Sequence, residues 1–300
     1  MIGKKDLTTN IVEASEVPTE IQAENRERIR SLRLIDDEFM TKVFEDRECT
    51  EYLIRTILDR NDLSVINVQT QARLKNLQGR DVILDIFAKD TTGRLYNIEV
   101  QRDTKGASLK RARYHGSLID ANILRKGSDF DSLPDRYIIF ITETDVLDSQ
   151  IQVNRLQIGS KDTDKFYDDG AYTIYVNASM TDDTPVGNLI QDMWQTEADM
   201  ITSRILANRV KYFKEDERGE ATMNVLIEET KQEARENGLA EGFNEGQKVG
   251  LAMGRKEGLS KGRKKEKNQI ARSLLAEGLD PELISRTTGL TIDEINKLAN

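Results

Sequence analysis

Residues 82–102 read VILDIFAKDTTGRLYNIEVQR, and this stretch decides how the surrounding chain folds. Two runs rich in β-branched and aromatic residues flank a short turn at 91–93, a pattern that predicts a β-hairpin. If these three residues form the loop, pairing across it places Asp85 directly opposite Glu99. Directly opposed residues point to the same sheet face, with Cβ atoms about 4.5–5.5 Å apart. The hairpin therefore holds two carboxylates side by side, with Gln101 further along the same face.

The opposite face of the predicted hairpin is almost wholly apolar. A pairing slip of one residue would scatter these apolar side chains over both faces, so the pattern supports the register given above. The apolar set is Val82, Leu84, Ile86, Ala88, Tyr96, Ile98 and Val100.

Two carboxylates held this close repel each other, so a positive charge is expected between them. Mg²⁺ takes oxygen ligands, often one or two carboxylates, and fills its other positions with water and substrate phosphate. A metal ion there can activate water and stabilise the charge that builds on phosphorus. The spacing alone equally allows a half-solvated hairpin whose polar face carries Asp85 and Glu99 without a metal.

The motif D-x13-E-V-Q, formed by Asp85, Glu99 and Gln101, resembles the core of the PD-(D/E)XK nucleases. Gln101 stands where most members carry Lys. Together with residues 37–44 and 111–114, the hairpin is similar to the PD-(D/E)XK family transposases, also called recombination-promoting nucleases. The resemblance implies an α/β fold with a restriction-endonuclease-like core, in which helices flank a central mixed β-sheet, and a helical C-terminal extension.

The resemblance also implies a function. It predicts a Mg²⁺-dependent DNA endonuclease, for which Mn²⁺ can substitute, that hydrolyses phosphodiester bonds in recombination, transposition or defence. A second reading is a catalytically weak DNA-binding or oligomeric protein that keeps the nuclease fold. A structure-specific RNA nuclease fits less well, because aromatic residues are only 6% of the chain and fall mostly at core spacing.

The family motif assigns roles to individual residues. Asp85 and Glu99 are expected to hold the metal, with Asp37 completing the site directly or through water. Asp37 lies between Asp36 and Glu38, and an alternative role for it is to cap a helix. Gln101 is expected to orient the attacking water, since its amide donates and accepts hydrogen bonds but carries no charge.

Arg111 and Tyr114 are the predicted substrate-binding residues. They are three positions apart in a predicted helix over 108–124 and so share one face. Arg can grip a phosphate with two hydrogen bonds, and Tyr can hydrogen-bond or stack on a base. The structural alternative pairs Arg111 with a surface acid and places Tyr114 in the core.

Composition restricts the class of protein. The chain of 300 residues is 37% hydrophobic and 32% charged, with a net charge of −9 that argues against coating nucleic acid with its whole surface. It has no apolar run near the ~18–20 residues of a membrane span and no secretory leader pattern. The single Cys49 excludes an internal disulfide and predicts a buried thiol in a cytoplasmic protein. The single His115 excludes a catalytic His pair.

Periodicity and composition predict the order of parts along the chain. Strands are expected over 63–74, 136–142 and 172–177 in addition to the hairpin, and a helical pair over 32–59. The predicted parts are a flexible tail at 1–28, a nuclease-like domain at 29–180, a helical region at 181–236, a glycine-periodic segment at 237–267 and a helix-turn-helix-like module at 268–300.

Glycine recurs at every fourth position from Gly238 to Gly262. Each helical glycine costs roughly 0.8–1 kcal/mol relative to Ala, so an isolated helix here is weak. The segment is read either as a helix that associates with a second copy, giving a homo-oligomer, or as a flexible spacer. A four-residue period drifts ~40° per step around a helix, which favours a crossed or supercoiled partner.

The C-terminal region carries caps and positive charge. Seven Lys and Arg residues fall between 255 and 267, which is either a solvated helix face or a surface for the DNA backbone. Asp280 followed by Pro281 starts one short helix, and Thr291 with Glu294 forms a capping box for another. The last helix begins with acids, so partner docking is favoured over reading of bases.

Overall fold

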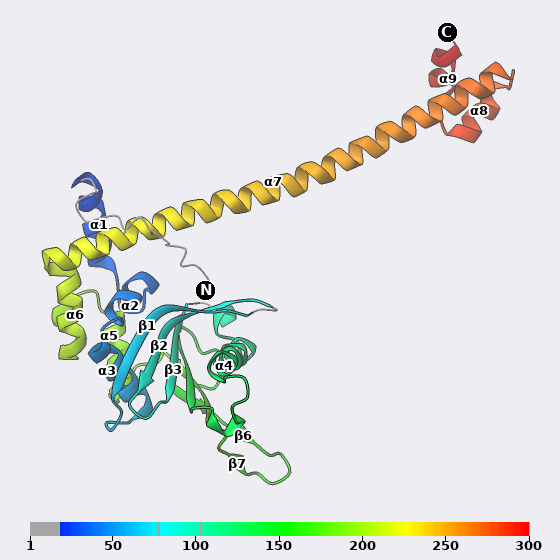
Figure 1. Cartoon of the computed structure of the whole chain (residues 1–300). Helices are drawn as coiled ribbons and strands as arrows, with labels where there is room; N and C mark the ends of the chain where they lie inside the picture. The colour runs from blue at the N-terminus through cyan, green and yellow to red at the C-terminus, as the bar shows by residue number, and fades with distance from the viewer. Residues whose placement is uncertain (1–18, 77–78, 103, 300) are drawn as a thin grey trace, which may run out of the picture. The chain divides into compact units, whose positions relative to one another are not determined.

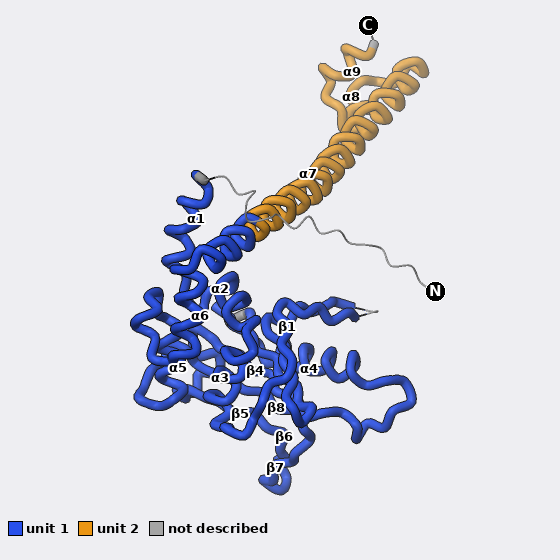
Figure 2. The backbone as a smooth tube through the Cα atoms, turned by 60° about the vertical axis from the view of Figure 1, so that its left-hand side comes forward, with its two compact units in different colours: residues 1–228 blue, residues 229–300 orange. Residues whose placement is uncertain are grey.

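The computed structural model describes residues 19–76, 79–102 and 104–299 and is drawn in Figure 1. The chain forms two compact units, one ending at residue 228 and one beginning at residue 229 (Figure 2). The first unit holds the β-sheet and most of the helices, and the second holds most of the longest helix and two short ones.

A six-stranded mixed sheet forms the centre of the first unit, which confirms the predicted α/β core. Its strand order is β1-β2-β3-β4-β8-β5, with β3, β4 and β8 parallel and the other neighbours antiparallel. A separate two-stranded ribbon was not predicted. The strands are β1 Val65–Leu74, β2 Val82–Asp90, β3 Leu95–Gln101, β4 Arg136–Thr142, β5 Val153–Leu156 and β8 Ala171–Asn177, with β6 Ile158–Gly159 and β7 Phe166–Tyr167 in the ribbon.

The hairpin of β2 and β3 has the predicted register. Ile86 pairs with Ile98, and the Asp90 N–H donates to the Arg94 carbonyl at 3.1 Å across the loop. Gly93 has a φ of 91°, a left-handed conformation that L side chains rarely adopt, so glycine at this turn position is required by the backbone. The same register brings Asp85 level with Glu99.

Strand β2 does not keep a single apolar face, and in this respect the prediction was wrong. Ile86 and Ala88 pack into a first core cluster, whereas Val82 and Leu84 pack into a second. The change coincides with Gln71 of the neighbouring strand β1, whose φ of 50° interrupts the extended backbone. The apolar side chains of β2 therefore change from one side of the sheet to the other between Leu84 and Ile86.

Helices cover both faces of the sheet, as Figure 1 shows. Helix α4, after β3, belongs to the second cluster through Ala112, Leu118 and Ile119. The other helices of the first unit contribute to the first cluster, including the start of α7 Glu217–Ala276 through Met223 and Ile227. Their bounds are α1 Thr19–Ser31, α2 Asp37–Val43, α3 Arg47–Leu58, α4 Leu109–Ile123, α5 Pro185–Trp194 and α6 Arg204–Glu215, with short 3-10 helices η2 Thr104–Ala107, η3 Phe130–Ser132 and η4 Ala198–Met200.

Two predicted boundaries differ from the structure. Helix α1 begins inside the stretch expected to be a tail, and the Asn25 amide donates to Glu228 at 3.0 Å; residues 1–18 of that tail lie outside the described residues. Residues of the expected separate helical region, such as Leu189 and Phe213, are buried in the first core cluster. The core therefore needs more chain than the predicted 29–180.

The second unit consists of the end of a long helix and two short helices. Helix α7 runs without a break from Glu217 to Ala276, so the glycine-periodic segment is helical. A Cβ atom added to any of the seven periodic glycines would meet no atom within 4 Å apart from its chain neighbours and the adjoining backbone of its own helix. Helices α8 Pro281–Thr288 and α9 Ile292–Ala299 pack against the end of α7 around Ala271, Ile284 and Ile295.

The predicted caps of the C-terminal helices are confirmed. The Asp280 carboxylate accepts from the Glu282 N–H at 2.7 Å, with Pro281 in the first turn. Gly289 ends α8 with a φ of 69°. The Thr291 N–H donates to Glu294 at 3.0 Å, and the Glu294 N–H donates back to the Thr291 hydroxyl at 3.3 Å, which is a capping box.

The predicted character of the single cysteine is also confirmed. Cys49 is a free thiol, buried at the start of α3, and burial raises its pKa well above the ordinary value. Such a thiol is not a nucleophile. Within the described residues, no helix has the length and apolar character needed to cross a membrane.

Candidate active site

Asp85 and Glu99 face each other across β2 and β3, as the sequence predicts. The Asp85 N–H donates to Glu99 Oε1 at 3.3 Å, and the Val100 N–H donates to Asp85 Oδ2 at 3.2 Å. Each carboxylate is therefore bonded to the backbone of the opposite strand. The backbone pairing of β2 with β3 ends at Ile86 and Ile98. Beyond that point the two carboxylates, rather than backbone carbonyls, accept the hydrogen bonds between the strands.

The pair carries more negative charge than its neighbours offset. Glu99 is fully buried, and its ion pair is with Arg111, whose Nη2 lies 3.3 Å from Oε2. Burial and then the Glu99 charge raise the pKa of Asp85 to about 7, and Asp37 adds to the effect. The Val100 N–H and Arg111 act in the opposite direction. A divalent cation at these two oxygen donors would relieve this repulsion.

Of the three neighbouring acids Asp36, Asp37 and Glu38, only Asp37 has a carboxylate that is not engaged by an arginine in the described structure. Asp36 is the N-cap residue of α2 and receives hydrogen bonds from Arg33, and Glu38 pairs with Arg28 at 2.6 Å. Desolvation of the Asp37 carboxylate raises its pKa, although the residue as a whole is exposed. The N-cap position of α2 belongs to Asp36, whose side chain makes no capping hydrogen bond, so Asp37 is not the N-cap residue.

The three predicted metal ligands do not form one closed cluster. In the part of the chain that the structure describes, no group of three or more His, Cys, Asp or Glu side chains is gathered closely enough to hold a metal. The oxygen donors of Asp85 and Glu99 suit Mg²⁺, which keeps water and substrate oxygens in its other positions. Asp37 influences Asp85 electrostatically, as expected of a group at the edge of such a site.

Gln101 lies at the end of β3, beyond Glu99 on the same strand. Its side-chain amide packs against Gly106 of η2, where an added Cβ would lie only 2.1 Å from Oε1. Glycine at that position therefore leaves room for the amide. The main chain of Gln101 is fixed as well, because its carbonyl accepts from the Glu143 N–H at 3.2 Å.

Arg111 and Tyr114 lie on α4, which starts at the Ser108 N-cap. Arg111 reaches the site directly through Glu99, and 37% of its side chain stays exposed. The Tyr114 hydroxyl accepts from the Asn76 amide at 2.9 Å and donates to the Arg80 carbonyl at 2.5 Å. These bonds fix Tyr114 to the connection between β1 and β2.

A basic hollow of about 730 Å³ adjoins the carboxylates. Four of its residues are cationic and one, Asp81, is acidic. Neither carboxylate lines the hollow, but two of its lining residues, Arg111 and His115, contact Glu99 and so connect the hollow to the pair. Its lining comprises Arg80, Asp81, Val82, Ile83, Ser108, Lys110, Arg111, Arg113, Tyr114, His115 and Ser117.

His115 and Asn97 belong to the site but were not predicted. His115 is buried with Nδ1 3.4 Å from Glu99 Oε1 and 3.3 Å from the Asn97 amide. Its Nε2 accepts from Arg111 Nε at 3.3 Å. The sequence spacing could have indicated both residues. His115 lies four residues after Arg111 on one helix face, and Asn97 lies two residues before Glu99 on one strand face.

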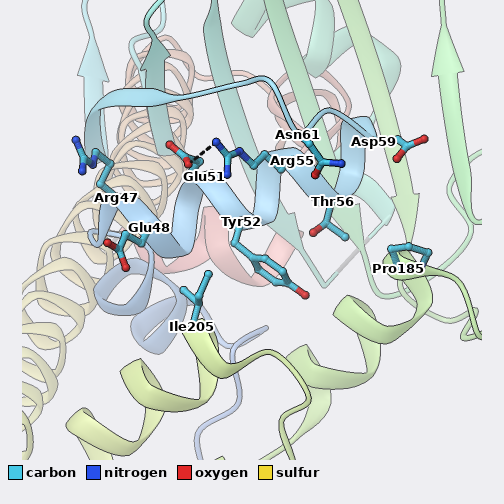
Figure 3. A pocket seen from close by; sticks show the side chains of 10 residues that line it. All are labelled: Arg47, Glu48, Glu51, Tyr52, Arg55, Thr56, Asp59, Asn61, Pro185 and Ile205. Atoms are coloured by element: carbon cyan, nitrogen blue, oxygen red, sulfur yellow. Dashed lines mark ion pairs between the residues drawn. The ribbon is translucent and has the colours of Figure 1, made fainter.

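Another hollow, of about 470 Å³, lies between α3 and the starts of α5 and α6 (Figure 3). Two of its charged residues, Glu51 and Arg55, already have structural partners. Glu51 pairs with Arg55 at 2.8 Å and accepts from the Val65 N–H, and Arg55 donates to the Leu63 carbonyl. The hollow beside Glu99 is therefore the better candidate for the functional site.

Comparison with protein families decides the assignment. Residues 45–194 match the model of the PD-(D/E)XK nuclease family transposase. The chain belongs to this family. Residues 264–300 match the C-terminal HTH domain of the Rpn/YhgA-like nuclease family. Searches of curated proteins and of solved structures returned no match.

The match to the PD-(D/E)XK nuclease family transposase covers the hairpin and α4, with every predicted site residue except Asp37. The match to the HTH domain covers the end of α7 together with α8 and α9, which confirms the predicted helix-turn-helix shape. Gln101, the residue predicted to stand at the Lys position of the family motif, lies inside the matched range.

Proposed function

We propose that the protein is a metal-dependent DNA endonuclease that hydrolyses phosphodiester bonds, with Mg²⁺ as its metal and Mn²⁺ able to replace it. The observation that supports this most directly is the Asp85 and Glu99 pair, whose buried Glu99 contacts Arg111 and His115 of a basic hollow. The transposase family model supports a setting in DNA recombination or transposition.

In this proposal Asp85 and Glu99 hold the metal, and Asp37 completes the site directly or through water. The bound metal would supply Lewis-acid stabilisation and a water of lowered pKa. Gln101 orients the attacking water through its amide. Arg111 binds a phosphate of the DNA strand, and Tyr114 forms part of the wall of the basic hollow.

A nicking assay tests the proposal. Supercoiled plasmid is incubated with the purified chain and Mg²⁺, Mn²⁺ or EDTA, beside the variants Asp85→Ala and Glu99→Ala. Nicking that needs metal and is lost in both variants would establish the carboxylates as a nuclease site. A folded wild type without cleavage, or variants that cleave equally well, would favour the second reading, a DNA-binding or oligomeric protein of weak activity.

The C-terminal unit supplies a second surface for DNA. Cations and amides of α7 line a hollow of about 600 Å³ with no acid among them, which fits the phosphate backbone. The start of α9 is acidic, which disfavours contact with phosphates. Its Glu294 accepts from the Thr291 N–H in the capping box and pairs with Lys264 at 3.4 Å. The lining residues, here called the α7 basic stripe, are Lys261, Lys264, Lys265, Asn268, Gln269 and Arg272.

A second copy of the chain is the other proposed partner. The seven periodic glycines of α7 leave open space where side chains would stand, and exposed apolar residues such as Leu239 and Phe243 lie next to them in the sequence. A partner helix could approach closely along this segment, which supports a homo-oligomer.

A further inference from the structure

We propose that His115 is a positioning residue that fixes the Glu99 carboxylate and tethers Arg111. The inference rests on the proposed function, because it concerns the same site. His115 lies with only 3% of its side chain exposed and contacts both residues from α4. It is the only histidine of the chain.

The hydrogen bonds determine which ring nitrogen carries the proton. The Arg111 guanidinium can only donate, so His115 Nε2 must accept and the proton lies on Nδ1. In the structure Nδ1 faces Asn97 Nδ2, which is also a donor, while the buried Asn97 Oδ1 has no partner among the described residues. A half-turn of the Asn97 amide removes both conflicts, since Oδ1 then accepts from Nδ1–H.

This tautomer turns Nδ1–H toward Glu99 Oε1, at 3.4 Å, and toward Asn97. Glu99 Oε1 also accepts from the Asp85 N–H, and Oε2 faces Arg111, so both of its oxygens are constrained. Residues that orient a metal-binding side chain in this way are part of the design of metal sites. His115 therefore keeps Glu99 in one orientation without adding a charge.

The same ring keeps Arg111 within reach of the site. Arg111 donates from Nε to His115 and from Nη2 to Glu99. A cation held by Glu99 would compete with Nη2 for the carboxylate and free it for the basic hollow, while the bond from Nε to His115 would keep Arg111 anchored. The guanidinium can then meet a phosphate without losing its anchor.

Because the chain has one histidine, its ring signals are unambiguous in NMR spectra of the full chain with ¹⁵N-labelled histidine. The expected spectrum at neutral pH shows a protonated Nδ1 and a bare Nε2. Addition of Mg²⁺ is expected to shift these signals, and Glu99→Gln is expected to abolish the shift. A ring protonated on Nε2, or signals that do not respond while calorimetry detects bound Mg²⁺, would overturn the inference.

A pair of variants separates positioning from packing. His115→Phe keeps a ring beside Phe140, whose centroid lies 6.1 Å away, but removes both hydrogen bonds. We expect Mg²⁺ affinity, measured by calorimetry, to fall about 10- to 100-fold. His115→Gln can accept from Arg111 and donate to Glu99, so it should recover most of the affinity.

Equal Mg²⁺ affinity in His115→Phe and wild type, with matching melting temperatures, would contradict the positioning role. If His115→Phe does not fold, the spectrum of the wild type decides. Neither readout requires cleavage. A protein that binds Mg²⁺ through the His115-dependent site but leaves plasmid intact would therefore refute the proposed nuclease and keep the positioning role.

Discussion

Asp85 is the residue whose ionisation is expected to affect both the stability of the fold and the proposed metal site. Its pKa is raised from 3.8 to about 7, so the folded state holds its proton more tightly than the unfolded state. Its charge therefore destabilises the metal-free fold above about pH 7, and this cost disappears as the pH falls toward 4. At about 1.4 kcal/mol per pKa unit, the cost reaches about 4 kcal/mol as an upper value.

Asp85→Asn should accordingly raise the melting temperature in EDTA at pH 8, and the gain should vanish near pH 4, where the wild type is protonated. Asp90→Asn is the matched control in the same hairpin. Asp90 accepts from the Thr92 and Tyr96 hydroxyls and from backbone N–H groups, and these bonds lower its pKa against the opposing effect of burial, so its loss should destabilise the fold at neutral pH. Thermal denaturation across pH measures both, and a drop in stability for Asp85→Asn at pH 8 would refute the assigned charge cost.

Gln101 is the second residue whose proposed role can be tested by substitution. Gln101→Lys restores the residue type of the family motif, and a positive charge near the attacking water should keep or raise metal-dependent cleavage. Gln101→Met keeps a similar volume without hydrogen bonds and should lower the rate about a hundredfold or more if the amide orients water. The rates are compared on the same plasmid substrate. A folded Gln101→Lys protein that no longer cleaves would count against the water-orienting role.

At the scale of elements, local signals predicted the hairpin but not what packs on it. Turn chemistry and alternation are local, so they fixed the register that joins Asp85 to Glu99. The contact of His115 with Asn97 depends on α4 folding back over β3 before the chain enters the parallel strand β4. Long-range packing of this kind leaves no periodic pattern, and the positive φ of Gln71 is likewise visible only in the backbone.

The α7 basic stripe gives a prediction at the same scale. Neutralising two of its cations in Lys265→Gln with Arg272→Gln should weaken DNA binding and reduce the slope of log affinity against log salt by about 2. The matched control removes two cations of α7 outside the stripe, in Arg235→Gln with Lys248→Gln, and should leave the slope unchanged. Fluorescence anisotropy over a salt series measures both. Equal slopes for the two double variants would favour a protein-docking role for the C-terminal module.

At the scale of the whole molecule, one helix carries two halves of opposite charge. Between residues 228 and 245 acids outnumber bases by six to two, and between 248 and 267 bases outnumber acids by eight to two. Two copies aligned antiparallel along this segment would bring unlike charges together, with the open glycines between them. The helix is poorly stabilised by its own sequence, because seven glycines weaken it, so a partner would contribute to holding it.

This arrangement predicts opposite effects on stability and association. Gly246→Leu with Gly250→Leu should strengthen the isolated helix, since each glycine costs roughly 1 kcal/mol, yet block close approach of a second copy. Sedimentation should then show a dimer in the wild type, weakened by salt, and a monomer in the variant with greater helicity by circular dichroism. Ala240→Leu with Ala252→Leu adds the same side chains off the glycine row and should leave the dimer intact. A monomeric wild type, or glycine variants that still dimerise, would show that the glycine row has no role in assembly.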